Sequence, residues 1–258
     1  MNSPIVLKIG GSIITDKSSA VPKALPGTIE RIAGELAGVC NENSPLILVH
    51  GAGSFGHPLA KQFKLTEQFD TKGLIETHRS VKSLNAMVVD ALVSAGVPAL
   101  PVHPLSCAML EQGRISDMQT APIHEMLNRG LVPVLHGDVA MDSVWGMDIL
   151  SGDQIVPYVA RKMGAELIGI GSNIDGVLDN KGQNIPEVTP ATFDGIRKYI
   201  GGSSHTDVTG GMLGKVQELV ELAGKSDISS RIFDASAAGS IIRFLQGETM
   251  GTLIQKNK

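Results

Sequence analysis

The residues best suited to bind or react with a ligand lie in the stretch 46–60, which reads LILVHGAGSFGHPLA. Four apolar residues lead into a glycine-rich turn, and His57 follows where a helix could begin. A strand–turn–helix junction presents backbone N–H groups and the positive end of a helix to an anion. The imidazole of His57 can add another donor at the same place. The pattern therefore predicts a phosphate site.

The same stretch matches the dinucleotide-binding pattern G-x-G-x-x-G through Gly51, Gly53 and Gly56. That fingerprint requires an acidic residue about 20 residues later, at the end of a second strand. Glu67 and Asp70 instead fall in a polar stretch with no strand before them, which disfavours a dinucleotide site. A tight turn that needs glycine only for its backbone geometry remains the simpler alternative.

Two lysines stand where a cation is unexpected. Lys8 interrupts an apolar strand predicted over 5–9, and an unpaired buried ammonium is costly, so the sequence predicts an anionic partner for it. Lys215 falls in the first turn of a helix predicted over 213–223, where the helix dipole opposes a cation and a bound anion would favour it. The alternatives are that Lys8 snorkels from an edge strand and that Lys215 is an ordinary surface lysine.

Five glycine-bearing or charged turns follow predicted strands or precede predicted helices, at 10–12, 51–57, 136–138, 151–153 and 207–215. In a parallel sheet such turns gather at the carboxyl ends of the strands, so we expect one shared crevice. Lys8, Lys17 and Lys215 could neutralise phosphate there, with Asp153 holding lysines in place, although Asp153 or Ser151 could instead cap a helix. This inventory suits phosphoryl transfer, which depends on positioning and charge stabilisation. No Walker A loop is present, because Val216 stands where Ser or Thr should bind magnesium.

The elements that must position these residues alternate between strand and helix. Strands are predicted over 5–9, 46–49, 97–102, 131–135, 166–170, 228–233 and 252–254, with a hairpin within 139–150. Helices are predicted over 28–39, 57–63, 77–95, 121–127, 155–163, 190–200, 213–223 and 240–245. This alternation favours a largely parallel sheet with helices on both faces. No linker or internal repeat divides the chain, and we expect one domain, 1–258, with approximate lobes 1–150 and 151–258.

Composition narrows the functional classes. The chain has 258 residues, 42% of them hydrophobic and 19% charged, the balance of a folded protein with a large core. A formal net charge of −4 offers no bulk attraction to nucleic acid or to an anionic membrane. No stretch reaches the length of a membrane span or resembles a signal peptide, and Cys40 and Cys107 have no metal or redox spacing. We expect a cytoplasmic protein that binds neither nucleic acid nor membrane.

The motifs, taken in order, resemble the amino acid kinase superfamily and, within it, the isopentenyl phosphate kinases. The resemblance runs from Val6 to Ile254, through KIGGS at 8–12, ITDK at 14–17, HGAGSFGH at 50–57, HGD at 136–138, SGD at 151–153, DGV at 175–177 and DVTGGM at 207–212 with Lys215. Any one motif is weak, whereas this ordered set is specific.

The resemblance implies an open three-layer αβα sandwich with a mainly parallel central sheet, acting as a homodimer. It implies transfer of the γ-phosphoryl group of ATP, with Mg²⁺, to isopentenyl phosphate in an archaeal-type mevalonate pathway. The residues that it implies for catalysis are Lys8, Lys17, His57, Asp153 and Lys215. Those implied for binding the acceptor are Ala52, Gly56, His57 and Gly152. Those implied for binding ATP are Lys8, Gly10, Gly11, Ser12, Gly53, Ser172, Asp175, Gly176, Asp179, Gly211 and Lys215. No residue is assigned as a metal ligand.

In the long helix, Ala86, Met87 and Val93 are candidates to line the pocket for the isoprenoid tail, or else to pack in the core.

The sequence departs from the family pattern at three places. Ala52 replaces a usual glycine, which requires a negative φ at this residue. Gln154 replaces a second aspartate, and 172–176 reads SNIDG rather than TDVDG. These departures bear on metal handling and base preference more than on the reaction. Two other functions stay open: a related kinase of small phosphates or phosphonates, of the fosfomycin type, and a non-catalytic protein that binds nucleotides or oxyanions.

Overall fold

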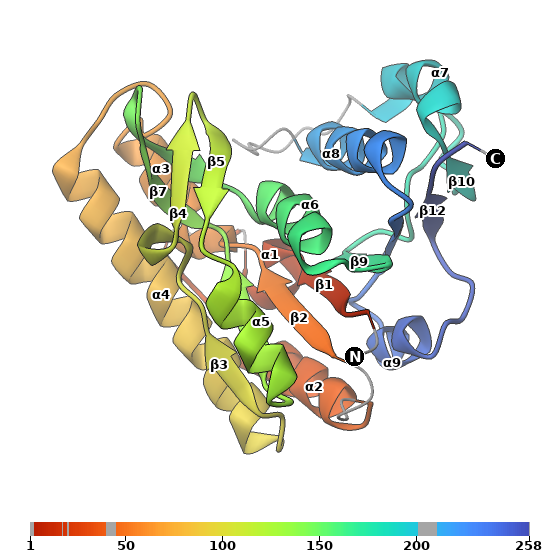
Figure 1. The fold of residues 1–258 in the computed structure, drawn as a ribbon, viewed down its shortest axis with the longest axis horizontal. Coiled ribbons are helices and arrows are strands. Elements are labelled where there is room, and N and C mark those ends of the chain that lie inside the picture. The colour runs from red at the N-terminus through yellow and green to blue at the C-terminus, as the bar shows by residue number, and fades with distance from the viewer. Residues whose placement is uncertain (1–2, 17, 20, 40–44, 201–210, 258) are drawn as a thin grey trace.

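A central sheet of eight strands organises the computed structural model, which describes residues 3–16, 18–19, 21–39, 45–200 and 211–257 (Figure 1). In spatial order its strands are β10 (Glu187–Val188), β12 (Thr252–Ile254), β11 (Ser229–Asp234), β9 (Leu167–Ser172), β1 (Ile5–Ile9), β2 (Leu46–His50), β6 (Val132–His136) and β3 (Ala99–Pro101). All neighbouring pairs are parallel except β11 and β12. The predicted, mainly parallel sheet is confirmed.

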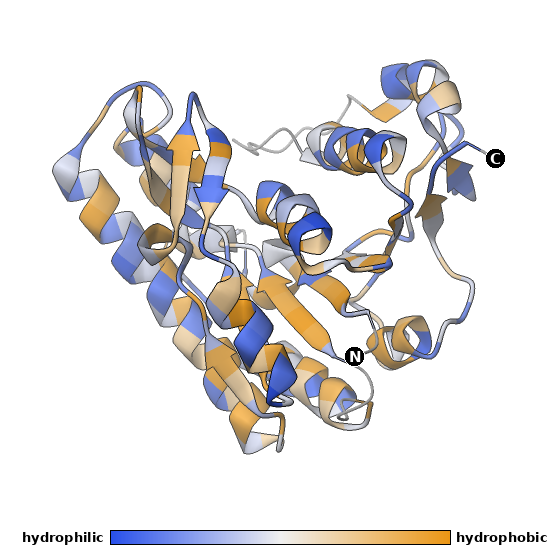
Figure 2. Cartoon of the chain, viewed as in Figure 1, coloured by the Kyte–Doolittle hydropathy of each residue, from blue (hydrophilic) through white to orange (hydrophobic). Residues whose placement is uncertain are grey.

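Helices cover both faces of this sheet. One face carries α2 (Pro26–Ala37), α4 (Thr71–Ser94) and α9 (Ser240–Leu245), and the other carries α5 (Ala121–Asn128), α6 (Gly152–Met163), α7 (Pro190–Ile200) and α8 (Gly211–Lys225). Alternate residues of the central strands enter the two cores: Val6 and Ile47 pack toward α6, whereas Leu7 and Leu48 pack toward α2 and α4. Figure 2 shows the apolar character of β2, which both helical layers bury. The three-layer αβα arrangement is therefore confirmed.

The strand register brings several chain turns to one level. Ile9 pairs with His50 and with Gly171, and His50 pairs with His136. Because these strands are parallel, the segments that follow them leave the sheet at the same edge. This edge is where the predicted crevice should lie.

A second sheet of four strands stands beside this edge. Its order is β5 (Arg114–Met118), β4 (Ala108–Glu111), β7 (Asp138–Asp142) and β8 (Gly146–Leu150). The β7–β8 hairpin was expected, but β4 and β5 were not, because the RISDM sequence of β5 has little apolar character. Asp142 stabilises both turns, since its carboxylate accepts hydrogen bonds from the backbone N–H groups of Gly113, Val144 and Trp145 at 2.8 Å each.

The long helix α4 begins six residues before the predicted start. Asp70 caps it by accepting a hydrogen bond from the Gly73 N–H at 2.6 Å. The polar first turn carries no apolar periodicity, so the pattern located only the part of the helix that faces the core. None of the described helices combines the length and the apolar character needed to cross a membrane.

Candidate active site

A cavity of about 370 Å³ opens at the carboxyl ends of β1, β2, β6 and β9. It is lined by most of the predicted site residues, namely Lys8, Gly10, Gly11, Ser12, Ala52, Gly53, Gly56, His57, Gly152, Asp153, Ser172, Gly211 and Lys215. The structure therefore brings together turns that are as much as 200 residues apart in the chain, at the place where a parallel sheet gathers its loops.

Two lysines share one largely buried carboxylate in this cavity, that of Asp153, whose side chain is 13% exposed. Lys8 Nζ lies 3.0 Å from Asp153 Oδ1, and Lys215 Nζ lies 3.3 Å from both carboxylate oxygens. Lys8 is 5% exposed, so the predicted need for an anionic partner is confirmed. Burial alone would raise the pKa of Asp153, but the two ammonium groups outweigh it and hold this pKa at about 2. Among the described residues, two lysines thus face one carboxylate, an excess of positive charge that suits an anionic ligand.

The local fold explains how Asp153 reaches both lysines. It lies in the first turn of α6, which Ser151 caps by accepting a hydrogen bond from the Gln154 N–H at 3.3 Å. Thus Ser151, not Asp153, is the capping residue. A side chain at Gly152 would place its Cβ 2.9 Å from Lys8 Cε, so the lysine needs glycine here in order to pass close to the helix.

The turns after β1 and β2 touch backbone to backbone. A Cβ at Gly11 would lie 2.4 Å from the Gly53 nitrogen, and a Cβ at Gly51 would lie 2.5 Å from the Gly11 nitrogen. Ala52 has a φ of −72°, which confirms the negative φ expected for an alanine at this position. Gly53 has a φ of +53°, a conformation that favours glycine. The two turns can therefore form one continuous backbone surface beside the cavity.

His57 is the first residue of α3 (His57–Gln62), a short helix that follows the 3₁₀ turn η1 (Gly53–Phe55). It is half-buried and lines the cavity, together with Gly56 and Ala52. This position is consistent with contact between the imidazole and an anion in the cavity.

Apolar side chains also line the cavity, among them Ala60, Val81, Ile149 and Leu150. The prediction that Ala86, Met87 and Val93 of α4 line the pocket is wrong. Met87 and Val93 are 46% and 55% exposed, and Ala86 is exposed as well. These three side chains therefore neither line the pocket nor pack in the core. The helix turns a different face to the site, and that face carries Thr77 and Val81.

Three of the residues expected to bind ATP do not line the cavity. Asp179 accepts hydrogen bonds from the Lys181 and Gln183 N–H groups at 2.8 and 2.9 Å, which stabilises its own turn. Gly176 has a φ of +116° and packs against Thr252. For Asp175, Gly176 and Asp179, contact with the nucleotide stays a prediction. Lys17 and the segment 207–210 lie outside the described residues.

Several residues that line the cavity were not predicted from the sequence. Among them are Gly137 and Asp138, which belong to a turn that was recognised but given no role. Thr77 is 2% exposed, and its Oγ1 has no hydrogen-bond partner among the described residues. It was predicted only as the first residue of a helix that could line the acceptor pocket, and it was given no role of its own.

Comparison with known proteins agrees with this geometry. The model of the amino acid kinase family matches residues 3–234. An isopentenyl phosphate kinase from Methanothermobacter thermautotrophicus is 36% identical, with 97% of this chain and 98% of the relative covered. The chain belongs to the amino acid kinase family.

Other members of this family carry the same name. An isopentenyl phosphate kinase from Methanocaldococcus jannaschii is 38% identical, with 96% of this chain and 97% of the relative covered. A solved isopentenyl phosphate kinase structure superimposes with a TM-score of 0.85 at 33% identity, covering 98% of this chain and all of the other. The amino acid kinase fold is thus supported by topology, sequence and superposition.

Proposed function

We propose that this amino acid kinase transfers the γ-phosphoryl group of ATP to isopentenyl phosphate, forming isopentenyl diphosphate and ADP. The observation that carries the proposal is the Lys8–Asp153–Lys215 cluster, which shares one cavity with His57 and with apolar side chains such as Ala60 and Val81. Such a cavity can hold an anion and a short hydrocarbon tail at once. The similarity to isopentenyl phosphate kinases over nearly the full chain supports this acceptor.

In the proposed reaction, a phosphate oxygen of the acceptor forms a bond with the γ-phosphorus of ATP. The bond from this phosphorus to the β,γ-bridging oxygen breaks, and ADP leaves with that electron pair. The acceptor phosphate is already an anionic nucleophile, so no strong general base is needed. The work of the protein is to bring two anions together and to stabilise the charge on the transferred group.

The proposed roles are those that the family resemblance implies, and the positions of Lys8, Lys215, Asp153 and His57 in the cavity support them. Lys8, Lys215 and Lys17 stabilise the transferred phosphoryl group, and Asp153 orients lysines. His57 donates to the acceptor phosphate, beside the backbone of Ala52, Gly56 and Gly152. The remaining contacts to ATP come from Gly10, Gly11, Ser12, Gly53, Ser172 and Gly211, with Asp175, Gly176 and Asp179 nearer the rest of the nucleotide. In this assignment, 1–150 mainly binds the acceptor and 151–258 mainly binds ATP.

The charged residues of the cavity suit ATP that enters with Mg²⁺ already bound to its phosphates. The buried carboxylate of Asp153 already bonds to two lysines, so we infer that the phosphate oxygens of ATP supply most of the ligands that Mg²⁺ prefers. Bound in this way, Mg²⁺ would neutralise charge on the phosphates. The lysines and backbone N–H groups would supply the remaining positive potential.

We also propose a cytoplasmic homodimer acting in an archaeal-type mevalonate pathway. Six large apolar side chains on α4, β3, β4 and β7 are 40–55% exposed, namely Ile75, Met87, Val93, Leu100, Met109 and Met141. Exposed apolar groups of this kind are common at protein interfaces. Sedimentation of the purified protein tests the proposal, and a monomer at micromolar concentration would contradict it.

A coupled assay of ADP release over a panel of small phosphates tests the proposed reaction. We expect isopentenyl phosphate to be turned over with ATP and Mg²⁺ in preference to fosfomycin. Turnover of fosfomycin alone would favour the related phosphonate kinase, and binding of ATP without any turnover would favour a non-catalytic protein. The ion-paired lysines argue against the second alternative, because they are the groups that transfer requires.

A further inference from the structure

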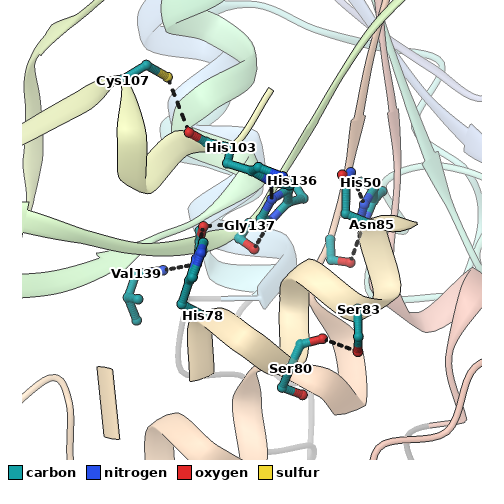
Figure 3. Close-up of polar contacts among 12 residues, drawn as sticks. His50, His78, Ser80, Ser83, Asn85, His103, Cys107, His136, Gly137 and Val139 are labelled. Atoms are coloured by element: carbon teal, nitrogen blue, oxygen red, sulfur yellow. Dashed lines mark hydrogen bonds and ion pairs between the residues drawn. The ribbon is translucent and has the colours of Figure 1, made fainter. Parts of the chain in front are cut away.

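Two buried histidines stand directly behind the phosphate-binding turns. His50 ends β2 and His136 ends β6, they pair in the sheet register, and their rings stack with centroids 5.6 Å apart (Figure 3). They are 1% and 0% exposed, and neither is among the described residues that line the cavity. The glycine that follows each of them, Gly51 or Gly137, does line it. The two imidazoles are therefore one residue away from the site without reaching it.

Each ring bonds to the carbonyl of its own glycine. His50 Nδ1 lies 3.1 Å from the Gly51 oxygen, and His136 Nδ1 lies 3.0 Å from the Gly137 oxygen. A carbonyl oxygen can only accept, so Nδ1 must carry the hydrogen in both rings. Burial lowers the pKa of each histidine to about 4, which keeps both rings neutral near pH 7.

The hydrogen bonds of the second ring nitrogen, Nε2, agree with a hydrogen on Nδ1 in both histidines. In a neutral ring with a hydrogen on Nδ1, Nε2 is an acceptor. Asn85 Nδ2 lies 3.0 Å from His50 Nε2 and donates to it, although the Asn85 Oδ1 then has no hydrogen-bond partner among the described residues. His103 Nδ1 lies 2.9 Å from His136 Nε2 and donates to it in the same way. In both series of hydrogen bonds the donors therefore point in one direction, from a donor side chain through the imidazole to a glycine carbonyl.

The consequence for the site follows from peptide geometry. In a planar trans peptide the C=O and the N–H point in opposite directions. Holding the Gly51 carbonyl against His50 turns the next N–H, that of Ala52, the other way. Glycine lowers the barrier to rotating such a peptide, and rotation would aim a carbonyl oxygen at an anion in place of a donor. The Gly51 and Gly137 N–H groups are also fixed, by the Ile9 and His50 carbonyls at 2.9 Å each.

We propose that His50 and His136, as neutral Nδ1–H imidazoles, are positioning residues that hold the Gly51 and Gly137 carbonyls away from the acceptor phosphate and leave the Ala52 N–H aimed toward it. The inference rests on the proposed function, because it assigns the acceptor phosphate to the Ala52 side of the cavity. It adds two residues that touch neither substrate.

The test uses substitutions that separate the hydrogen bond from the packing. In His50→Asn and His136→Asn, the amide nitrogen takes the place of Nδ1 and keeps the donor, whereas Leu fills more of the space and has none. We expect each Leu variant to lose roughly tenfold or more in kcat/KM for isopentenyl phosphate, mainly through the acceptor KM, with the ATP KM changed less than about twofold. Each Asn variant should retain most of the activity. His124→Leu, at an exposed position on α5, is the matched control.

Packing alone predicts the opposite order, in which the apolar Leu variants are at least as active as the less well packed Asn variants. That result would overturn the proposal. A second measurement does not depend on turnover: a long-range ¹H–¹⁵N spectrum of the wild-type protein should show a hydrogen on Nδ1 of both rings. Hydrogens on Nε2 would contradict the proposal even in an active enzyme. Absence of isopentenyl phosphate turnover, with the hydrogens on Nδ1, would overturn the proposed function instead.

Discussion

Two polar clusters lie at the same edge of the central sheet, and they use opposite electrostatics. Lys8, Asp153 and Lys215 line the cavity as ion pairs, in which two lysines face one carboxylate among the described residues. His50 and His136 are neutral, lie behind the cavity wall and bond to backbone carbonyls. The comparison suggests that phosphate recognition needs both a source of charge and a mechanism that keeps backbone donors, rather than acceptors, facing the ligand.

The largest expected effect comes from removing charge at the first cluster. Lys8→Met and Lys215→Met each remove an ammonium group proposed to stabilise the transition state, and kcat should fall roughly 10²–10³-fold, the loss typical for one oxyanion-stabilising group. Steady-state ADP release measures the effect. Lys225→Met, an exposed residue at the end of the same helix α8, should stay within about twofold of wild type. Similar activity in all three variants would remove the charged cluster from the mechanism.

Asp153→Asn tests whether the carboxylate holds the two lysines together. Without it, two ammonium groups lie close together with no compensating charge, and removing one partner of a buried ion pair costs about 3–5 kcal/mol of unfolding free energy. Denaturant unfolding measures that loss, and activity should fall as well. An unchanged midpoint of denaturant unfolding in Asp153→Asn would mean that solvent already screens the charges of the two lysines.

The pH dependence of stability separates the two clusters. The histidines bind protons near pH 6.5 when unfolded but only near pH 4 when folded, so unfolding takes up protons and stability should fall as pH drops from about 6.5 to about 4. The contribution of Asp153, whose pKa is lowered from 3.8 to about 2, is present above pH 3.8 and is lost only between these two values. Unfolding free energies measured at pH 7, 5.5 and 4.5 should therefore report mainly the histidines. A His50→Asn/His136→Asn double variant should flatten this part of the profile, and an unaltered slope would contradict the assignment.

Ala52→Gly should have the smallest effect. The φ of −72° suits alanine, so glycine gains no needed conformation and only increases the entropy of the unfolded chain, at a cost of about 0.4–1 kcal/mol. Activity should change less than about twofold, because the histidine still fixes the Gly51 carbonyl. A large loss of activity with little change in thermal unfolding would instead show that the methyl group touches the substrate.

The same contrast explains what the sequence could reveal. Lys8 stood out because a charge in an apolar strand needs a partner, and glycine-rich turns mark loops that approach a ligand, so most of the cavity could be predicted. A buried histidine at the end of a strand carries no such signal, because its role depends on which ring nitrogen faces which neighbour. That information exists only once β2, β6 and α4 are packed together.

The fold was predictable for a related reason. Alternating apolar strands and amphipathic helices are strong local patterns, so the central sheet and its helices could be located. The β4–β5 hairpin is held by contacts with the distant residue Asp142, and α4 begins with a polar turn capped by Asp70. The local spacing of apolar residues in the sequence predicts neither the β4–β5 hairpin nor the polar first turn of α4. Ala86, Met87 and Val93 were misplaced because helical spacing defines a face without saying what covers it.

The direct backbone contact of Gly11 with Gly51 and Gly53 has a consequence for enzyme engineering. Because no side chain separates the turn after β1 from the turn after β2, the gap between the proposed nucleotide and acceptor subsites is set by the thickness of two peptide chains. The far wall of the acceptor subsite is built instead from exchangeable side chains such as Val81 and Ile149. Libraries that vary those two positions could change the length of the accepted alkyl chain while the two reacting phosphates keep their spacing.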